Sequence, residues 1–306
     1  MKEEELPGRG GWEQVEPVLP GRLIGLQGRL ARPFWGVLGI GAVLCGALAS
    51  DRFRWNGEDL LTLALALLLV DLAWGNLWAL AAGTDWFRPL AEGWPPAHPA
   101  RMAAPPYTRP RSPAGRFFRW LNRLVGWWRE AFWPVAGSAL LGMAAAAALA
   151  AVLSLLLPDR LRLLNAVLVA VVGLGVAQRR RGRTSWGGEA LVQVGLGWLA
   201  GHLAFAEMSG PSLILALAFA LAAWGSLRAA QKLRGGLWLQ NGGQVVSAVL
   251  LVVLKEPLAA GVVALLLFGQ VAMQPLLRLG GDPARILRRA WPWLMAAMLT
   301  AAWAIR

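Results

Sequence analysis

The stretch WPVAGSALLGMAAAAALAAVLSLLL, residues 133–157, contains no charged side chain over its whole length. A helix of about 20 apolar residues crosses the hydrocarbon core of a bilayer, so this stretch is long enough to span a membrane. Much of it is Ala, Gly and Ser, and such small residues let helices approach one another closely in lipid. The stretch therefore predicts a membrane-spanning helix.

Eight further apolar runs accompany this stretch, and most of them reach the length of a spanning helix. They cover residues 34–50, 58–83, 161–177, 187–208, 211–227, 242–255, 257–277 and 290–305. The run at 242–255 is short and ends at Lys255-Glu256-Pro257, where proline breaks a helix. Two arrangements follow: nine spans, or eight spans in which 242–277 is one long kinked helix.

The composition agrees with a membrane protein. Hydrophobic residues make up 57% of the 306 residues and charged residues only 15%, against about 25% charged in a typical soluble domain. Trp is abundant, 18 residues against one Tyr, and many of these indoles flank the apolar runs, where they fit the headgroup level. The single cysteine, Cys45, lies inside an apolar run, and we expect no cleavable signal peptide in the polar first 30 residues.

The basic residues predict the topology. The net charge is +13, but Lys and Arg are concentrated in short connections between apolar runs, which favours a topological role over nucleic-acid binding. With nine spans, 24 of the 30 basic residues fall on one side of the membrane. The eight-span arrangement would move four arginines of the segment 278–289 to the other side. We therefore expect nine spans with the N-terminus cytoplasmic and the C-terminus outside, in the inner (cytoplasmic) membrane of a cell.

Two segments are predicted to lie on the cytoplasmic side without spanning. One is residues 1–33, and the other is the connection 84–132, whose part 89–113 holds eight prolines. Within this connection, AGRFFRWLNRLVGWWREAF at 114–132 mixes aromatic residues with arginines, which is typical of an amphipathic helix lying in the membrane interface. The alternative is a cytoplasmic extension of the third spanning helix.

Several short segments carry a family resemblance. RLARP at 29–33 precedes the first span, and GNLWALAAGTDWFRPL at 75–90 ends the second. A basic turn at 178–183 leads to Gly187 and Gly188, and RAAQKLRGG at 228–236 follows the sixth span. In this order and spacing, the segments resemble the UbiA-type membrane prenyltransferases, and the resemblance covers most of residues 28–305.

The resemblance implies a UbiA-like bundle of nine spanning helices over residues 34–306, with the topology predicted above. It also implies an active site near the cytoplasmic side, where two aspartate-rich motifs hold Mg²⁺ on the diphosphate of a polyprenyl donor. One motif follows the second helix and reads Asn-Asp-x-x-Asp-x-x-x-Asp before Arg-Pro-Leu. The other follows the sixth helix.

Both motifs are degenerate in this chain. The aspartates of the first align with Leu77, Leu80 and Thr84, and Asp85 is displaced by one position. The second motif keeps no carboxylate and is basic instead. Since Mg²⁺ needs several oxygen ligands and leucine supplies none, we expect no metal site, no cofactor and no prenyl transfer. Mg²⁺ would enter only if the chain were an enzyme.

The residues that remain define a candidate site with both a functional and a structural interpretation. The expected residual cavity comprises Asp71, Asn76, Asp85, Arg88, Arg228, Gln231, Lys232 and Arg234. A carboxylate within the membrane, such as Asp71, is a functional candidate by default, although it could equally fix helix contacts by pairing with Arg228. We expect Asn76, Arg228 and Gln231 to form the floor of the cavity, facing one another near the cytoplasmic surface, unless these groups only join helices.

The sequence also contains an arginine cluster after the fourth apolar run and a histidine within the fifth. The cluster Arg179, Arg180, Arg181 and Arg183 is most often a topology anchor at an anionic lipid surface and less often a phosphate clamp. His202, in the fifth span, has no second metal ligand at suitable spacing, so a buried, hydrogen-bonded imidazole is expected.

These features predict a non-catalytic UbiA-like membrane protein. It would bind membrane lipid, a quinone, another isoprenoid or a pigment, or serve as an accessory subunit beside other membrane proteins. The alternative is a divergent prenyltransferase acting on an aromatic or quinone-precursor acceptor. A transporter is a third possibility, for which Asp71 is the main support and the lack of broken helices the main objection.

Overall fold

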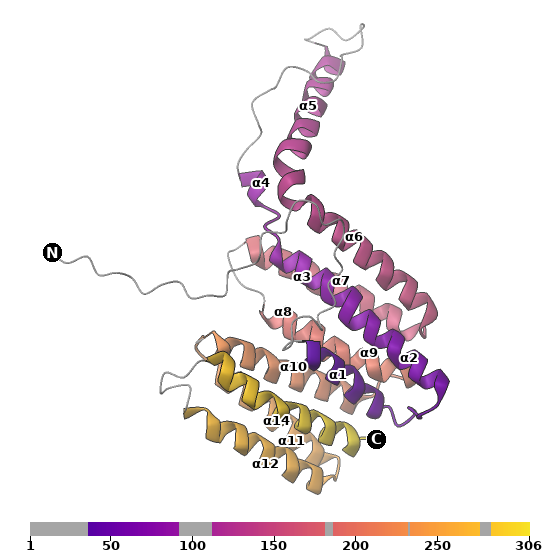
Figure 1. The fold of residues 1–306 in the computed structure, drawn as a ribbon, viewed down its shortest axis with the longest axis vertical. Coiled ribbons are helices and arrows are strands. Elements are labelled where there is room, and N and C mark those ends of the chain that lie inside the picture. The colour runs from indigo at the N-terminus through magenta and orange to yellow at the C-terminus, as the bar shows by residue number, and fades with distance from the viewer. Residues whose placement is uncertain (1–35, 92–111, 181–185, 232, 276–282) are drawn as a thin grey trace, which may run out of the picture.

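The structure is a computed structural model that describes residues 36–91, 112–180, 186–231, 233–275 and 283–306. All regular secondary structure in these residues is helical and forms nine rods, in the order predicted from the apolar runs (Figure 1). Five of these rods are long and apolar enough to cross a membrane. The chain is therefore a multi-pass membrane protein, as its composition predicted.

The first four rods contain most of the irregular helix geometry. They are α1 (Gly36–Leu48); α2, η2 and α3 (Gly57–Leu68, Leu69–Trp74 and Gly75–Gly83); α5, η3 and α6 (Pro113–Trp127, Trp128–Phe132 and Trp133–Leu156); and α7 (Arg160–Arg180). The short helix α4 (Arg88–Ala91) follows the second rod. The η segments are π-helical turns inside longer rods, a feature often found near functional sites.

The remaining five rods are more regular, and only the first of them contains a π-helical turn. They are α8, η4 and α9 (Trp186–Ala190, Leu191–Gly195 and Leu196–Phe205); α10 (Gly210–Ala230); α11 (Gly236–Val253); α12 (Pro257–Met273); and α14 (Pro283–Ala304).

The residues from Leu254 to Pro257 decide whether this part of the chain forms two helices or one kinked helix. Lys255 has a left-handed backbone with φ of 64°, which ends α11 instead of allowing it to continue. Pro257 is the first residue of α12, where the missing N–H of proline leaves no hydrogen bond unmade. The two helices fold back and pack against each other. The prediction of nine helices is confirmed, and the single kinked helix is wrong.

The seventh helix begins earlier than the apolar run at 242–255 predicted. Gly235 has φ of 78°, a conformation that glycine adopts readily, and it starts α11 at Gly236. The first turns of α11 carry the polar residues Gln240 and Asn241, which hid this part of the helix from a hydropathy reading. Gln240 Nε2 donates to Gln270 of α12, and Asn241 exchanges hydrogen bonds with Gln274 at the end of that helix. Gln240 Oε1 is buried without a hydrogen-bond partner among the described residues.

Close backbone approach holds α1 against α9. A Cβ atom added at Gly46 would overlap the carbonyl group of Trp198, and one added at Gly201 would overlap the carbonyl group of Val43. The pair α10 and α11 is packed in the same way through its own glycines. Small residues thus allow van der Waals contact between helices, which drives association in lipid.

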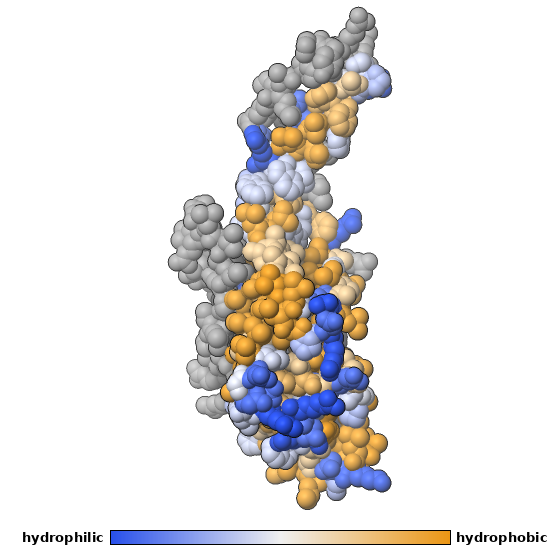
Figure 2. Space-filling view, turned by 90° about the vertical axis from the view of Figure 1, so that its right-hand side faces the viewer, coloured by the Kyte–Doolittle hydropathy of each residue, from blue (hydrophilic) through white to orange (hydrophobic). Residues whose placement is uncertain are grey.

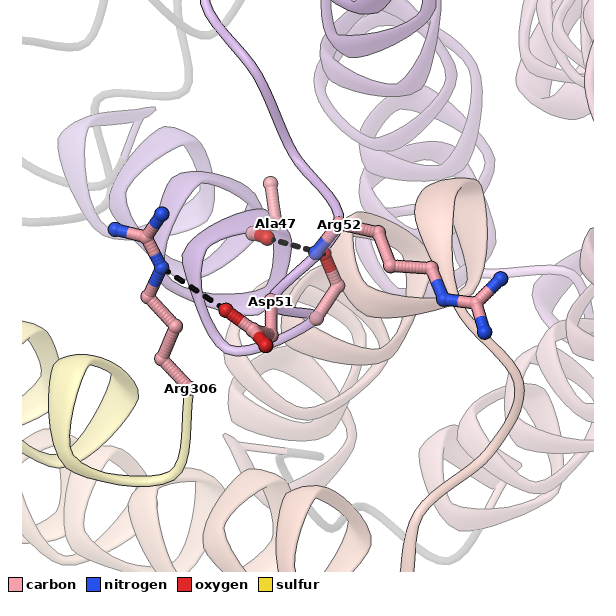
Figure 3. Close-up of polar contacts among 5 residues, drawn as sticks. Ala47, Asp51, Arg52 and Arg306 are labelled. Atoms are coloured by element: carbon pink, nitrogen blue, oxygen red, sulfur yellow. Dashed lines mark hydrogen bonds and ion pairs between the residues drawn. The ribbon is translucent and has the colours of Figure 1, made fainter.

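The connections between rods alternate between two ends of the bundle (Figure 1). The α10–α11 connection and helix α4 lie at one end, while the α1–α2 turn and the C-terminus lie at the other. At this second end, Arg306 Nε donates to Asp51 Oδ1 at 3.2 Å (Figure 3). Ser50 Oγ stabilises the same turn by donating to the carbonyl of Ala47 and accepting from the N–H of Arg52.

The segment 114–132 is helical, as predicted, and continues into α6 without a break. The complete rod, Pro113–Leu156, has 44 residues. A straight helix of this length would measure about 66 Å, roughly twice the hydrocarbon thickness of a bilayer. The rod bends at η3, so that α5 turns away from the direction of the bundle helices (Figure 1). Its position at a membrane interface stays a prediction, and residues 1–35 and 92–111 lie outside the described residues.

Candidate functional site

The second rod carries the first degenerate motif. Asp71 is half-buried in the π-helical turn η2, and Asn76 is buried in the first turn of α3. Asn76 Nδ2 donates to the carbonyl of Leu72 at 2.5 Å, one helical turn earlier in the same rod. This amide donor is therefore used within its own helix.

Three positions at which the UbiA resemblance would place aspartates are Leu77, Leu80 and Thr84, and the structure gives each of them a packing or capping role. Leu80 packs against α6 at Gly142, where a Cβ atom would come within 2.8 Å of Leu80 Cδ1. Leu77 is partly buried against the hydrophobic core. Thr84 is the C-cap residue of α3 and has an extended backbone. These positions contribute to helix packing and helix termination.

The one carboxylate displaced from this motif is used as a helix cap. Asp85 Oδ1 accepts from the backbone N–H groups of Phe87 at 3.3 Å and Arg88 at 3.1 Å, which is the N-cap arrangement before the short helix α4. The side chains of Asp85 and Arg88 are both exposed. Among the described residues, no group of three His, Cys, Asp or Glu side chains is placed to hold a metal ion.

The second degenerate motif makes local contacts at the α10–α11 connection. Arg228 Nη2 donates to the carbonyl of Arg234 at 3.0 Å, and its guanidinium lies 5.8 Å from the centre of the Trp224 ring. Gln231, the C-cap residue of α10, has an exposed side chain, and so has Arg234. Lys232 lies outside the described residues. The interactions of Arg228 thus stabilise its own turn.

The region between α3 and α10 is filled by the fifth rod and two indoles. Trp78 of α3 is buried and packs against Gly188 of α8 and Gly175 of α7. From the other side, the ring of Trp224 on α10 packs against Gly187. Because Gly187 and Gly188 have no side chains, each indole can pack directly against the backbone of α8. Helix α8 thus lies between the indoles of α3 and α10.

No hydrogen bond joins Asn76, Arg228 and Gln231 to one another among the described residues, so their expected role as the floor of a polar cavity stays a prediction. Asn76 is bonded within its own rod, whereas the side chain of Gln231 is exposed at the end of another. The fifth rod packs between the helices that carry the two motifs. Both α8 and η4 pack against α10, while η4 also packs against α3 and α8 also packs against α7. The helix ends that carry the two motifs lie at one end of the bundle (Figure 1).

The basic cluster after α7 lies beside the first motif. Arg179 and Arg180 form the exposed last turn of α7, and the Arg180 guanidinium lies 5.5 Å from the centre of the Phe87 ring. This contact places the end of α7 next to the connection between α3 and α4. Arg181 and Arg183 lie outside the described residues.

A polar pair in the fifth rod was missed by the sequence reasoning. Gln193 is buried in η4, and its Nε2 donates to Glu189 Oε1 at 3.2 Å. The turn η4 packs against η2, which carries Asp71. A Glu and a Gln four residues apart in an apolar run were the available signal, because residues at this spacing meet on one face of a helix.

Asn165 was missed as well, although it connects three rods. It accepts from Trp74 Nε1 at 2.8 Å and donates to Ser154 Oγ at 2.6 Å. Ser154 in turn donates to the carbonyl of Ala150. A single Asn within the apolar run 161–177 was the signal for this helix-joining role.

His202 is buried in the last turn of α9. Its Nε2 lies 3.0 Å from the carbonyl oxygen of Glu207, just beyond the helix end. The imidazole thus has a hydrogen-bond partner that helps to close the turn between α9 and α10.

A groove of about 370 Å³ lies on the protruding part of the third rod. It is lined by Leu124, Val125, Trp127, Trp128 and Arg129, which belong to α5 and η3. At its base, Trp127 Nε1 donates to the carbonyl of Pro89 at 2.9 Å and so connects this rod to α4.

Comparison with known proteins adds no relative to these observations. No protein-family model, no curated protein and no solved structure matches the chain.

Proposed function

We propose that the chain is a non-catalytic UbiA-like protein of the cytoplasmic membrane, with its N-terminus inside and its C-terminus outside. It binds membrane lipid, a quinone, another isoprenoid or a pigment, or serves as an accessory subunit of a larger membrane complex. The order of nine rods supports this proposal, and so do the positions of the two degenerate motifs at one end of the bundle.

The packing of Trp78 and Trp224 against α8 is the observation that carries the non-catalytic part. Charge on a departing diphosphate must be neutralised by metal ions or fixed cations in a site that admits the substrate. Here two indoles and the helix start at Gly187 and Gly188 occupy the region between the motifs. The carboxylates that would bind Mg²⁺ are replaced by Leu77 and Leu80, which contribute to apolar packing.

The lateral surface supports a role among lipids and membrane partners. Large apolar side chains are highly exposed on α11 and α12, including Val253 at 71%, Leu258 at 86% and Phe268 at 70%. Apolar residues also cover much of the face shown in Figure 2. Such a surface needs lipid acyl chains or other membrane subunits to cover it.

The test for catalysis is turnover of a radiolabelled prenyl diphosphate with an aromatic acceptor, measured with Mg²⁺ and with a chelator. We expect no difference between the two conditions. An active UbiA-type enzyme under the same conditions is the positive control. Chelator-sensitive turnover by the unmodified protein would refute the non-catalytic proposal in favour of a divergent prenyltransferase.

The test for ligand binding is mass spectrometry of small molecules released from protein purified in mild detergent. A quinone, isoprenoid or pigment retained in stoichiometric amount would support a binding role, and defined protein partners that purify with it would support the accessory role. A prenyl diphosphate retained together with Mg²⁺ would instead favour the enzyme.

The charge distribution supports the orientation, because 24 of the 30 basic residues belong to one side in the nine-span arrangement. The test uses a Cys45→Ala background in oriented cells and an impermeant maleimide. We expect labelling of Arg160→Cys from outside the cell, and labelling of Arg234→Cys only after the membrane is opened. The reverse pattern would overturn the orientation.

A further inference from the structure

We propose that α5 and η3 form a docking element that binds the surface of an anionic lipid leaflet. The proposal goes beyond the function proposed above, since a membrane-surface element would serve an enzyme or a non-catalytic protein equally. It commits to the leaflet of the protein's own membrane as the bound surface, not to a protein partner.

The first support is the division of α5 into two faces. At 100° per residue, Phe117, Leu121, Leu124 and Trp128 share one side of the helix, and the other aromatic residues flank them. Arg116, Arg119 and Arg123 lie on the opposite side, and α5 contains no Asp or Glu. An aromatic face opposite an Arg-rich face is the pattern of helices that lie in the membrane interface.

The second support is the exposure of the aromatic face. Phe117 is 57% exposed and Trp120 is 51% exposed, and their rings stack on each other with centroids 6.0 Å apart. The groove lined by residues 124–129 continues this apolar face toward η3. Figure 2 shows both apolar and polar atoms on the protruding upper part of the molecule. Among the described residues, α5 packs extensively only against η3, which follows it.

The third support is the direction of α5. The rod that contains it is too long to span a bilayer in a straight line, and it bends at η3 so that α5 runs across the direction of the bundle helices (Figure 1). Trp127 Nε1 fixes this bend by its hydrogen bond to Pro89. At the far end, Ser112 Oγ caps the helix by accepting from the N–H of Gly115 at 3.1 Å. The direction and the cap suit a stable helix that lies along a membrane surface.

The positive charge on the polar face of α5 favours binding to a negatively charged membrane surface. Each Arg near a negatively charged leaflet strengthens binding on the order of fivefold at physiological ionic strength. Arg116 and Arg123 are exposed and reach the headgroup region when the aromatic face is inserted, because long side chains extend toward water. In η3 the charge of Arg129 is offset by the adjacent Glu130, so the net positive charge of the element comes from α5.

The experiment measures which face of α5 enters the lipid of proteoliposomes. The full chain, in a Cys45→Ala background, carries one spin label at Phe117→Cys or Trp120→Cys on the apolar face, or at Arg116→Cys or Arg123→Cys on the polar face. Accessibility to oxygen, which partitions into lipid, is compared with accessibility to a water-soluble nickel complex. The vesicles contain phosphatidylcholine alone or phosphatidylcholine with about one-third phosphatidylglycerol.

In the anionic vesicles we expect labels at positions 117 and 120 to be accessible to oxygen and shielded from nickel, and labels at positions 116 and 123 to show the reverse. Replacing Arg116, Arg119 and Arg123 together by Gln should lower the shielding at position 117 at least severalfold, whereas the triple Lys variant should retain it. Arg160→Gln with Arg162→Gln, at the opposite end of the bundle, is the matched control and should change nothing.

Equal exposure of positions 117 and 120 to nickel in both kinds of vesicle would overturn the proposal. Protection of these positions only in native membranes, with other proteins present, would assign the aromatic face to a protein partner and would overturn it as well. Neither outcome bears on prenyl transfer, so this failure is distinguishable from a failure of the proposed function.

Discussion

Replacing Gln270 by Leu should be among the most destabilising single changes in the bundle. Gln270 is 2% exposed and joins α12 to α11 through three hydrogen bonds. It accepts from Gln240 Nε2 at 2.9 Å and from Gln244 Nε2 at 2.8 Å, and it donates to Gln244 Oε1 at 3.0 Å. Gln244 is itself fully buried, so the loss of its partner leaves an amide without hydrogen bonds inside the membrane domain.

The magnitude follows from counting the bonds that each variant loses. Side-chain hydrogen bonds between membrane helices contribute about 0.6 kcal/mol on average and up to about 1.7 kcal/mol. Gln270→Leu loses three bonds, or about 2–5 kcal/mol, and Gln244→Leu loses two, or about 1–3 kcal/mol. The double variant loses the same three bonds as Gln270→Leu, because both bonds of Gln244 involve Gln270. The double variant should therefore be no less stable than Gln270→Leu, with a coupling energy of about 1–3 kcal/mol.

The assay is the free energy of unfolding in mixed micelles, obtained by titration with a denaturing detergent and followed by circular dichroism. Gln178→Leu is the control, since Gln178 is exposed at the end of α7 and should change stability by less than about 0.5 kcal/mol. If the effects of the two single variants simply add in the double variant, the three bonds do not form the connected network described here.

Three further predictions concern packing and charge. Gly243→Ala should destabilise the protein by about 1–3 kcal/mol, because the added Cβ would overlap the carbonyl of Ala218. Gly242→Ala is the control: its Cβ would meet no atom within 4 Å, so the change should be neutral or stabilising. Thermal unfolding of both variants in detergent tests this difference. Leu77→Asp with Leu80→Asp should lower the folded yield and produce no Mg²⁺-dependent turnover, because Leu80 packs against α6 and a half-buried carboxylate would disturb this apolar contact. Chelator-sensitive activity in the prenyl diphosphate assay would contradict this prediction. Asp51→Asn should change stability by less than about 1 kcal/mol, since the side chains of its ion pair with Arg306 are 66% and 42% exposed, and any effect should shrink in high salt.

The number and order of the rods could be predicted from the sequence because hydrophobic length and the sidedness of basic residues are local properties of the chain. The break before Pro257 was visible for the same reason. The beginning of α11 was placed too late, because a hydropathy reading counts Gln240 and Asn241 as polar whether or not a neighbouring helix supplies their hydrogen bonds. The π-helical turn at Trp128–Phe132 lies directly before Pro134, whose missing N–H leaves the carbonyl of Glu130 without its usual helical donor. This proline was the available signal for the bend of the third rod.

The candidate site was harder to predict, because an aligned motif gives residue types but not the neighbours that each residue meets. Asn76 and Gln231 belong to motifs that a family resemblance places together, yet one is bonded within its rod and the other is exposed. Between the helices that carry them, Gly187 and Gly188 admit two indoles from different helices. No pattern within either motif carries that information.

The polar side chains inside the bundle mainly connect neighbouring helices by hydrogen bonds. A polar group within a membrane is a functional candidate by default, because its burial is costly. In the described residues, Asn165 joins α7 to α3's rod and to α6, Gln270 joins α12 to α11, and Trp198 Nε1 donates to Ser212 at the start of α10. Each of these groups meets its partner on an adjacent helix, where a substrate would have to compete for the same hydrogen bonds. A bundle that uses its amides and hydroxyls in this way gains rigid helix contacts, and that use fits a scaffold in a membrane complex better than a site that must accept and release a charged substrate.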